Sequence, residues 1–407
     1  MPSAQTHDGT LSARGRVQTA ICGRNLNMEV FMKRIICFFL CVLMFAAPAA
    51  YAEGTVETDA KSTILIEAST SEVLYEENAD EQLPIASVTK IMTMLLIAEA
   101  VDSGKITLDD MVPVSENAMS YGGSTMFLEA GEQLSVNDML KGIAVASAND
   151  GCVAMAEFLE GSETAFVEKM NEKAKELGME NTCFMNTNGL DEDGHYSSAR
   201  DVAIMSRELM KHPLILDYTT IWTDTLRDGK FSLANTNKLI RFYTGANGLK
   251  TGSTSQALCC ISAAAKRDDM QLIAVVLGAP TSAKRFSSAK ALLDYGFANY
   301  KIENVLNSGE ELQRVAVSKG VADDIGVRAA EDYSVLRKKS AGAEITTEIV
   351  CDEVLSAPIA EGDVVGSIII SDGETTTEAE LVAAETVDRK SFADIVTEFF
   401  GNLMTGV

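Results

Sequence analysis

Residues 84 to 92 read "PIASVTKIM" and place Ser87 three residues before Lys90, at the start of a long apolar segment. On a helix, side chains at positions i and i+3 are neighbours on one face, so this hydroxyl and this amine can touch. No charged residue follows Lys90 until Glu99, and the segment between them is apolar nearly all round, which is typical of a buried central helix. A lysine that desolvation holds neutral can accept the proton of a serine nucleophile.

The same serine–lysine spacing occurs again at Ser287 and Lys290. Lys284 and Arg285 lie in the same segment, which predicts a charged helix. Such a helix is a poorer place for a neutral lysine, because solvent stabilises the charged form. We therefore take Ser87 and Lys90 as the candidate nucleophile and base.

A second motif, S-x-N, occurs in "ASANDG" at residues 146 to 151, where it contains Ser147 and Asn149. It lies between two apolar segments with helical patterns, and small residues on either side allow other parts of the chain to approach. The same pattern begins at Ser115, in a polar turn, and at Ser135, which is better explained as a helix cap. The copy at Ser147 is therefore the candidate functional one.

The third motif, K-T-G, occurs once, in "LKTGST", and leads into a predicted strand. Each of the three motifs is weak alone. In the order S-x-x-K, S-x-N and K-T-G, on a buried helix, an interhelical loop and a strand, they are strong together. They predict a serine hydrolase whose base is a lysine.

The amino-acid composition limits the possible domain organisation and the possible partners. The chain has 407 residues, 46% of them apolar and 23% charged, which predicts two folded units with a sizeable core. The formal net charge is −25. Binding to nucleic acid requires lysine and arginine to neutralise phosphates, so the charge argues against a nucleic-acid partner.

Histidine and cysteine are too sparse or too scattered for a metal centre. Of the three histidines, His7, His195 and His212, only His195 could serve a catalytic triad or a metal, and H-E-x-x-H is absent from the sequence. No C-x-x-C pair suggests zinc, and the five cysteines beyond the leader are no disulfide framework. We expect no metal and no cofactor, and a base that is not histidine.

Residues 32 to 52, "MKRIICFFLCVLMFAAPAAYA", combine a basic start, an apolar stretch and an A-x-A cleavage site. This pattern predicts a secretory signal peptide, with a mature chain that begins near Glu53. A retained membrane anchor is the alternative, although the stretch is short for a membrane span. Residues 1 to 31 resemble neither signal nor fold, and an over-called start codon would explain them.

The remaining chain divides into three predicted parts. Residues 53 to 297 contain a strand hairpin, several helices, a second hairpin and a final helix, which indicates an α+β domain whose antiparallel sheet carries helices on both faces. The helix that begins near Ala199 is expected to stop at Pro213. Residues 298 to 388 carry short strand patterns separated by glycine and acidic turns, as in a small all-β domain.

The last part, residues 389 to 407, predicts an amphipathic helix. Its apolar residues recur at helical spacing: Phe392, Ile395, Val396, Phe399, Phe400, Leu403 and Met404. We expect this helix to lie in a membrane interface. The alternative is a helix docked on the β domain, because Asp394 and Glu398 on the polar face would be repelled by anionic lipids.

Together the three motifs resemble the penicillin-recognising serine enzymes, and most closely the low-molecular-mass penicillin-binding proteins that act as D-alanyl-D-alanine carboxypeptidases (peptidase family S11). The stretches "GLDEDGHYSSARDVA" and "NTNKLIRFYTGANGLKTG" add to the resemblance, which covers about residues 55 to 390. It implies a penicillin-binding/β-lactamase-like domain followed by the β domain and the tail. It also implies an exported enzyme at the outer face of the cytoplasmic membrane or in the cell wall.

By this resemblance, Ser87 attacks the carbonyl between two D-alanines of a peptidoglycan stem peptide and forms an acyl-enzyme. Lys90 accepts its proton, although the base is disputed in this superfamily. Ser147 relays a proton to the leaving amine, helped by Lys250. β-Lactam antibiotics would acylate the same serine.

The resemblance assigns substrate binding to six residues: Asn149, Lys250, Thr251, Gly252, Ser253 and Arg285. Asn149 would bond the substrate amide, and Lys250 and Thr251 its carboxylate. The N–H groups of Ser87 and Ser253 would form the oxyanion hole. Arg285 would lie near the carboxylate, and a solvated helix charge is the alternative. Relatives often have a larger residue than Ser253, which affects the expected substrate reach.

Three rival functions use related motifs. A class A β-lactamase needs a glutamate in an E-x-x-L-N pattern after S-x-N, and the loop at 183 to 198 has none. A non-enzymatic penicillin-binding sensor needs a membrane span and a partner domain. A D,D-endopeptidase uses the same residues, but its usual form lacks the β domain. The domain count favours the carboxypeptidase.

Overall fold

The computed structural model describes residues 56–342, 344–373 and 375–405. The predicted signal peptide and the residues before it lie outside these ranges.

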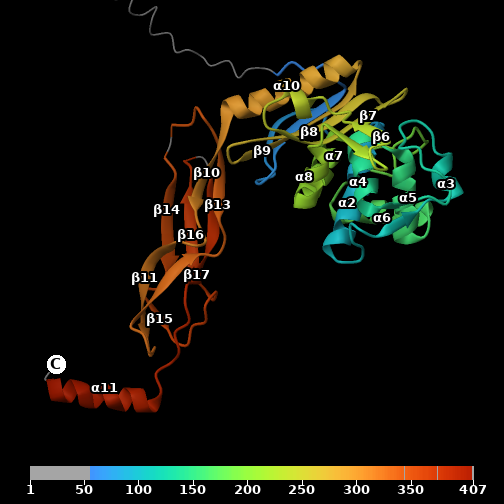
Figure 1. Cartoon of the computed structure of the whole chain (residues 1–407). Helices are drawn as coiled ribbons and strands as arrows, with labels where there is room; N and C mark the ends of the chain where they lie inside the picture. Colours follow the sequence, from blue (N-terminus) through green and yellow to red (C-terminus); the bar gives the residue numbers. More distant parts are fainter. Residues whose placement is uncertain (1–55, 343, 374, 406–407) are drawn as a thin grey trace, which may run out of the picture. The chain divides into compact units, whose positions relative to one another are not determined.

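The α+β domain is built on an antiparallel sheet of five strands in the order β2-β1-β9-β8-β7 (Figure 1). Both predicted hairpins are present in it, and the fold class predicted from the sequence is confirmed. The strands are β1 (Ser62–Glu67), β2 (Val73–Glu77), β7 (Ala246–Thr254), β8 (Leu258–Arg267) and β9 (Met270–Ala279).

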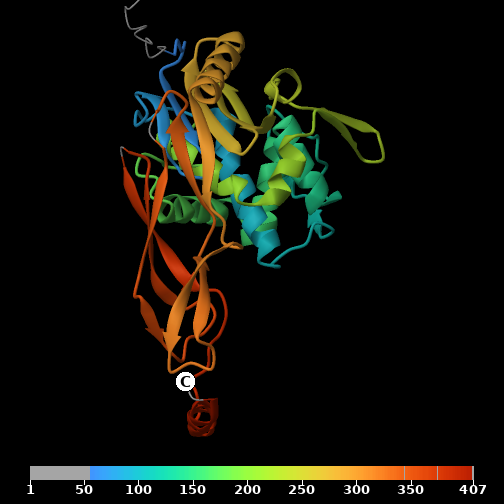
Figure 2. The ribbon, with the colours of Figure 1, turned by 90° about the vertical axis from the view of Figure 1, so that its left-hand side faces the viewer.

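Helices cover both faces of this sheet (Figures 1 and 2). Alternate side chains of a strand point to opposite faces, so each central strand contributes residues to two apolar cores. In β9, Leu272 and Ala274 pack with Leu292 of α10 (Ser282–Asn299) on one face. Ile273 and Val275 belong to the larger core on the other face. The helices of that core are α2 (Lys90–Asp102), α4 (Val136–Lys141), α5 (Asn149–Glu160), α6 (Glu163–Glu176), α7 (Ala199–Met210) and α8 (Pro213–Thr219).

The helix predicted from Ala199 ends before Pro213, as expected: α7 ends at Met210, and Pro213 is the first residue of the next helix, α8. Proline suits the first turn of a helix, where its missing N–H has no intrahelical acceptor. The short polar chain after α8 forms the hairpin β5 (Thr223–Leu226) and β6 (Phe231–Ala234), which the sequence analysis did not predict and which projects outward in yellow-green in Figure 2.

The remaining short elements of the α+β domain lie in its loops. They are β3 (Met111–Pro113), β4 (Gln133–Ser135), α3 (Glu116–Ser120), α9 (Leu239–Phe242), the 3₁₀ turn η1 (Ala86–Thr89) and the π-helical turn η2 (Gly142–Ala146).

The C-terminal part is rich in β-structure, as predicted, and has its own apolar core. β10 (Tyr300–Leu306) pairs with β13 (Tyr333–Lys338). A six-stranded sheet has the order β14-β16-β17-β12-β11-β15. Its strands are β11 (Glu311–Ser318), β12 (Asp324–Ala329), β14 (Thr346–Cys351), β15 (Val354–Ser356), β16 (Val364–Ser371) and β17 (Thr376–Ala383).

The tail forms a helix, α11 (Phe392–Thr405). Phe392 is 82% exposed and Ile395 is 53% exposed. Within the described ranges, no helix is long and apolar enough to cross a membrane.

Candidate active site

Ser87 and Lys90 meet at the start of α2. Ser87 lies in η1, and Lys90 is the first residue of α2. The Lys90 Nζ donates to Ser87 Oγ at 2.9 Å, so the predicted contact exists. Ala86, which precedes the serine, has a φ of +49°, a conformation that is uncommon for a residue other than glycine and recurs at functional sites. The second S-x-x-K copy differs, since Ser287 Oγ donates to the carbonyl of Lys284 on an exposed turn of α10.

Lys90 is completely buried. Its Nζ has two further acceptors, Asn149 Oδ1 and the carbonyl oxygen of Asn188, both at 2.7 Å. Burial lowers the pKa of Lys90 to about 8, although the nearby Asp150 carboxylate acts in the opposite direction. At this pKa about a tenth of Lys90 is neutral at pH 7, and the neutral form is the one that accepts a proton.

The S-x-N motif lies at the junction of η2 and α5. Ser147 is buried and has a φ of +65° at the end of η2. Asn149 begins α5, and its Nδ2 donates to the carbonyl of Gly122 at 2.7 Å while its Oδ1 accepts from Lys90. The first two motifs are therefore joined by a direct hydrogen bond.

Strand β7 brings the third motif against the Ser87 turn. A Cβ atom at Gly252 would lie 2.7 Å from the carbonyl oxygen of Ile85 and 2.8 Å from the backbone nitrogen of Ser87. Only glycine allows so close an approach of the two backbones. The strand also carries Thr251, whose hydroxyl donates to Thr236 Oγ1 at 2.7 Å, and the exposed Ser253.

Lys250 adds a second buried amine to the site. It is 1% exposed, and its Nζ donates to the carbonyl of Thr251 at 2.9 Å. Burial lowers the pKa of Lys250 well below its usual value, and the neighbouring Lys90 and Arg285 lower it further. A bound anion would stabilise the charged form, so the arrangement favours a substrate with a carboxylate.

Arg285 is also buried, with 7% of its surface exposed, so it is not a solvated helix charge. Its Nη1 donates to the carbonyls of Gly252, at 3.0 Å, and Cys260, at 3.3 Å. The structure thus places Arg285 against the K-T-G strand.

His195 lies beside the site and bonds two neighbouring parts of the chain. Its Nδ1 accepts the N–H of Met185 at 3.1 Å, so the proton is on Nε2, which lies 2.8 Å from Thr89 Oγ1. Burial lowers the pKa of His195 to about 4, so the ring is neutral. Through this hydrogen bond the His195 ring fixes the side chain of Thr89, which directly precedes Lys90.

A family model described as D-alanyl-D-alanine carboxypeptidase, peptidase S11, matches residues 48–281. The chain belongs to this family. A second model, described as penicillin-binding protein 5, C-terminal domain, matches residues 300–389 of the carboxypeptidase.

Relatives of this S11 carboxypeptidase cover nearly its whole length. D-alanyl-D-alanine carboxypeptidase DacF of Bacillus subtilis is 44% identical over 384 residues, which are 91% of this chain and 99% of the relative. DacC of Escherichia coli is 35% identical over 370 residues, 88% of this chain and 92% of the relative. The crystal structure of penicillin binding protein 5 from Haemophilus influenzae has a TM-score of 0.71 at 32% identity, covering 82% of this chain and 98% of that one. The protein is a serine-type D-alanyl-D-alanine carboxypeptidase.

Three residues of the carboxypeptidase site were not predicted. Asn188 acts through its backbone carbonyl, which carries no sequence signal. Asp150 is 1% exposed and accepts the N–H groups of Met126 and Leu128, which fixes the loop beside Asn149. Thr236 lies in a stretch that supported the family resemblance, but its contact with Thr251 depends on the fold.

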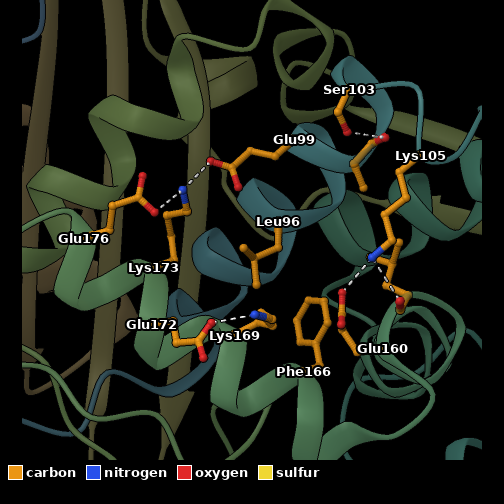
Figure 3. A pocket seen from close by; sticks show the side chains of 12 residues that line it. Leu96, Glu99, Ser103, Lys105, Glu160, Phe166, Lys169, Glu172, Lys173 and Glu176 are labelled. Carbon is orange, nitrogen blue, oxygen red and sulfur yellow. Dashed lines mark hydrogen bonds and ion pairs between the residues drawn. The ribbon is translucent and has the colours of Figure 1, made fainter.

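A hollow of about 410 Å³ lies elsewhere on the carboxypeptidase, beside α2 and α6. Figure 3 shows its charged side chains in pairs: Lys105 with Glu160, Lys169 with Glu172, and Lys173 with Glu99 and Glu176. These pairs neutralise one another, and we assign no chemistry to the hollow. Within the described residues, no cluster of histidine, cysteine and carboxylate side chains could hold a metal ion.

Proposed function

We propose that this carboxypeptidase removes the terminal D-alanine of peptidoglycan pentapeptide stems through an acyl-enzyme on Ser87. The Lys90–Ser87 hydrogen bond carries the proposal, because it joins a nucleophile to a buried amine of lowered pKa. In this mechanism Lys90 accepts the hydroxyl proton as Oγ attacks the carbonyl carbon. Ser147 relays this proton to the nitrogen of the leaving D-alanine as the C–N bond breaks, and water then hydrolyses the ester.

Substrate binding completes the proposal. Lys250 and Thr251 hold the terminal carboxylate, and Asn149 bonds an amide of the stem. The N–H groups of Ser87 and Ser253 stabilise the oxyanion, which forms where Gly252 lets β7 approach the serine. The burial of Lys250 and Arg285 beside the K-T-G strand supports this arrangement.

The covalent intermediate can be trapped. We expect a penicillin to add its mass once to the intact protein, and proteolytic mapping to place the adduct on the peptide that contains Ser87. An adduct on a peptide with Ser147 or Ser253 and not Ser87 would contradict the assignment of the nucleophile.

The pH dependence of acylation tests Lys90. Only the neutral amine accepts a proton, and its fraction rises about tenfold per pH unit well below the pKa of about 8 and saturates above it. We therefore expect the second-order rate constant for acylation by a penicillin to rise about tenfold from pH 6 to 7 and to level off above about pH 8.5. Stopped-flow or quench-labelling measurements give this profile. A rate that is constant from pH 6 to 9 would exclude Lys90 as the titrating base.

We also propose that the protein is exported and that α11 lies in the outer surface of the cytoplasmic membrane. The exposed Phe392 and Ile395 support this, since burial of one large side chain contributes about 1.5–3 kcal/mol. An extracytoplasmic substrate, peptidoglycan, fits the same location.

Deletion of residues 391–407 should release the enzyme from phospholipid vesicles and leave its activity on a soluble peptide unchanged. A matched pair of substitutions refines the test: Ile395→Asp, on the apolar side, should weaken vesicle binding, and Thr397→Asp, also exposed, should not. Vesicle co-sedimentation measures both. Loss of thermal stability in the deletion variant, with no vesicle binding by the full chain, would instead place the helix in the fold.

A further inference from the structure

Arg285 makes its polar contacts with backbone and hydroxyl groups. Besides the Gly252 and Cys260 carbonyls, its Nη2 donates to Ser282 Oγ at 3.1 Å. Its guanidinium also lies over the ring of Phe286, with 4.6 Å from Cζ to the ring centroid. These contacts hold the guanidinium between α10 and the adjoining ends of β7 and β8.

The Gly252 carbonyl and the Ser253 N–H belong to the same peptide group, so the direction of one fixes the direction of the other. Carbonyls of successive strand residues point to opposite sides. The Thr251 carbonyl accepts from Lys250 Nζ and so lies on the side of the site. The Gly252 carbonyl points the other way, toward Arg285. In a planar trans peptide the N–H is antiparallel to the C=O, so the N–H of Ser253 points into the site.

Gly252 pairs with Cys260 in a regular stretch of the β7–β8 ladder, and the register shift between Cys259 and Ile261 lies in the pairing of β8 with β9. β7 is also an edge strand of the sheet, with a ladder partner on one side. Arg285 adds donors to both carbonyls of the Gly252–Cys260 pair, beyond what the ladder itself provides.

We propose that Arg285 is a positioning residue, which holds the Gly252–Ser253 peptide so that the Ser253 N–H stays aimed at the oxyanion. It acts through the Gly252 carbonyl and not by contact with the substrate carboxylate. This inference rests on the proposed function, in which that N–H stabilises the tetrahedral intermediate.

The chemistry of arginine suits this role. A planar guanidinium with several fixed donors can hold two carbonyls at once and remain stacked on a ring, whereas the ammonium of lysine is a point donor on a flexible stem. Arg285→Lys therefore keeps the positive charge but loosens the peptide. Lys284→Gln is a matched control, because the preceding residue on α10 is exposed and paired with Asp59.

The test uses two D-alanyl thioesters with identical acyl groups, one with a free carboxylate in the leaving group and the other with a carboxamide. A positioning residue should matter equally for both. We expect Arg285→Lys and Arg285→Gln to lower kcat about 30-fold with either thioester, and to leave the ratio of the two kcat/KM values within about twofold of the wild type. Lys250→Gln, a carboxylate contact, should instead lose activity mainly with the free carboxylate.

Two results would overturn the proposal. If the Arg285 variants lost activity only with the free-carboxylate thioester, Arg285 would be a substrate contact. If kcat were unchanged with both thioesters, Arg285 would have no role in catalysis. Thermal melting of Arg285→Lys, which keeps the buried charge, shows that the protein assayed is folded. Failure of the proposed function would be evident separately, because the wild type would then not be acylated on Ser87.

Discussion

Ser87→Ala is expected to release no D-alanine and to form no covalent adduct with a fluorescent penicillin. Without Oγ there is no nucleophile for the acyl-enzyme, so activity should fall by more than about 10³-fold. The fold should survive, because Lys90 keeps two of its three hydrogen-bond acceptors, Asn149 and the Asn188 carbonyl. Gel fluorescence after labelling and an enzymatic assay for D-alanine measure the two activities.

The second S-x-x-K copy provides the control. Ser287 is exposed and bonds only the helix carbonyl of Lys284 among the described residues. Ser287→Ala should therefore label and turn over like the wild type. If Ser87→Ala still labels while Ser287→Ala does not, the wrong copy has been assigned.

Gly252→Ala should be nearly as damaging, although it removes no functional group. The new methyl would lie 2.7 Å from the Ile85 carbonyl oxygen and 2.8 Å from the Ser87 nitrogen, and both of these are backbone atoms that cannot rotate away. The strand and the serine turn must separate, which moves both oxyanion donors. Loss of one such donor costs about 10²–10³ in rate, and we expect a loss of about this size in acylation by a penicillin.

Gly309→Ala is the matched control for this substitution. A Cβ atom at Gly309 would meet no atom within 4 Å, and its backbone is not in the left-handed region. This variant should acylate at the wild-type rate. Wild-type acylation by Gly252→Ala would show that the oxyanion hole does not depend on the close approach of β7.

The sequence predicted the parts of the fold that depend on local pattern. The hairpins β1–β2 and β8–β9 have strong strand patterns and short turns, and both are present. The two other S-x-N copies could be told apart from the functional one: Ser135 caps α4, as expected, and Ser115 caps α3. The S-x-x-K pair was recognisable because the apolar residues after Lys90 indicate burial.

Features that depend on distant contacts were not predicted. The hairpin β5–β6 was missed because its strands are only four residues long, although Asp228-Gly229 between them is a hairpin-turn signal. The left-handed backbones of Ala86 and Ser147 are imposed by the surrounding fold, since neither residue favours that region. The Asn188 carbonyl and the Arg285–Gly252 contact involve backbone groups, which any residue type presents.

Digestion of a pentapeptide-ended muropeptide, followed by mass analysis, tests the central claim most directly. A D-alanyl-D-alanine carboxypeptidase shortens each stem by one alanine residue, releases free D-alanine and leaves crosslinks between stems intact. Ser87→Ala should leave the same muropeptide unchanged. Cleavage of crosslinked dimers without loss of terminal alanine, or covalent penicillin binding with no product at all, would contradict the account.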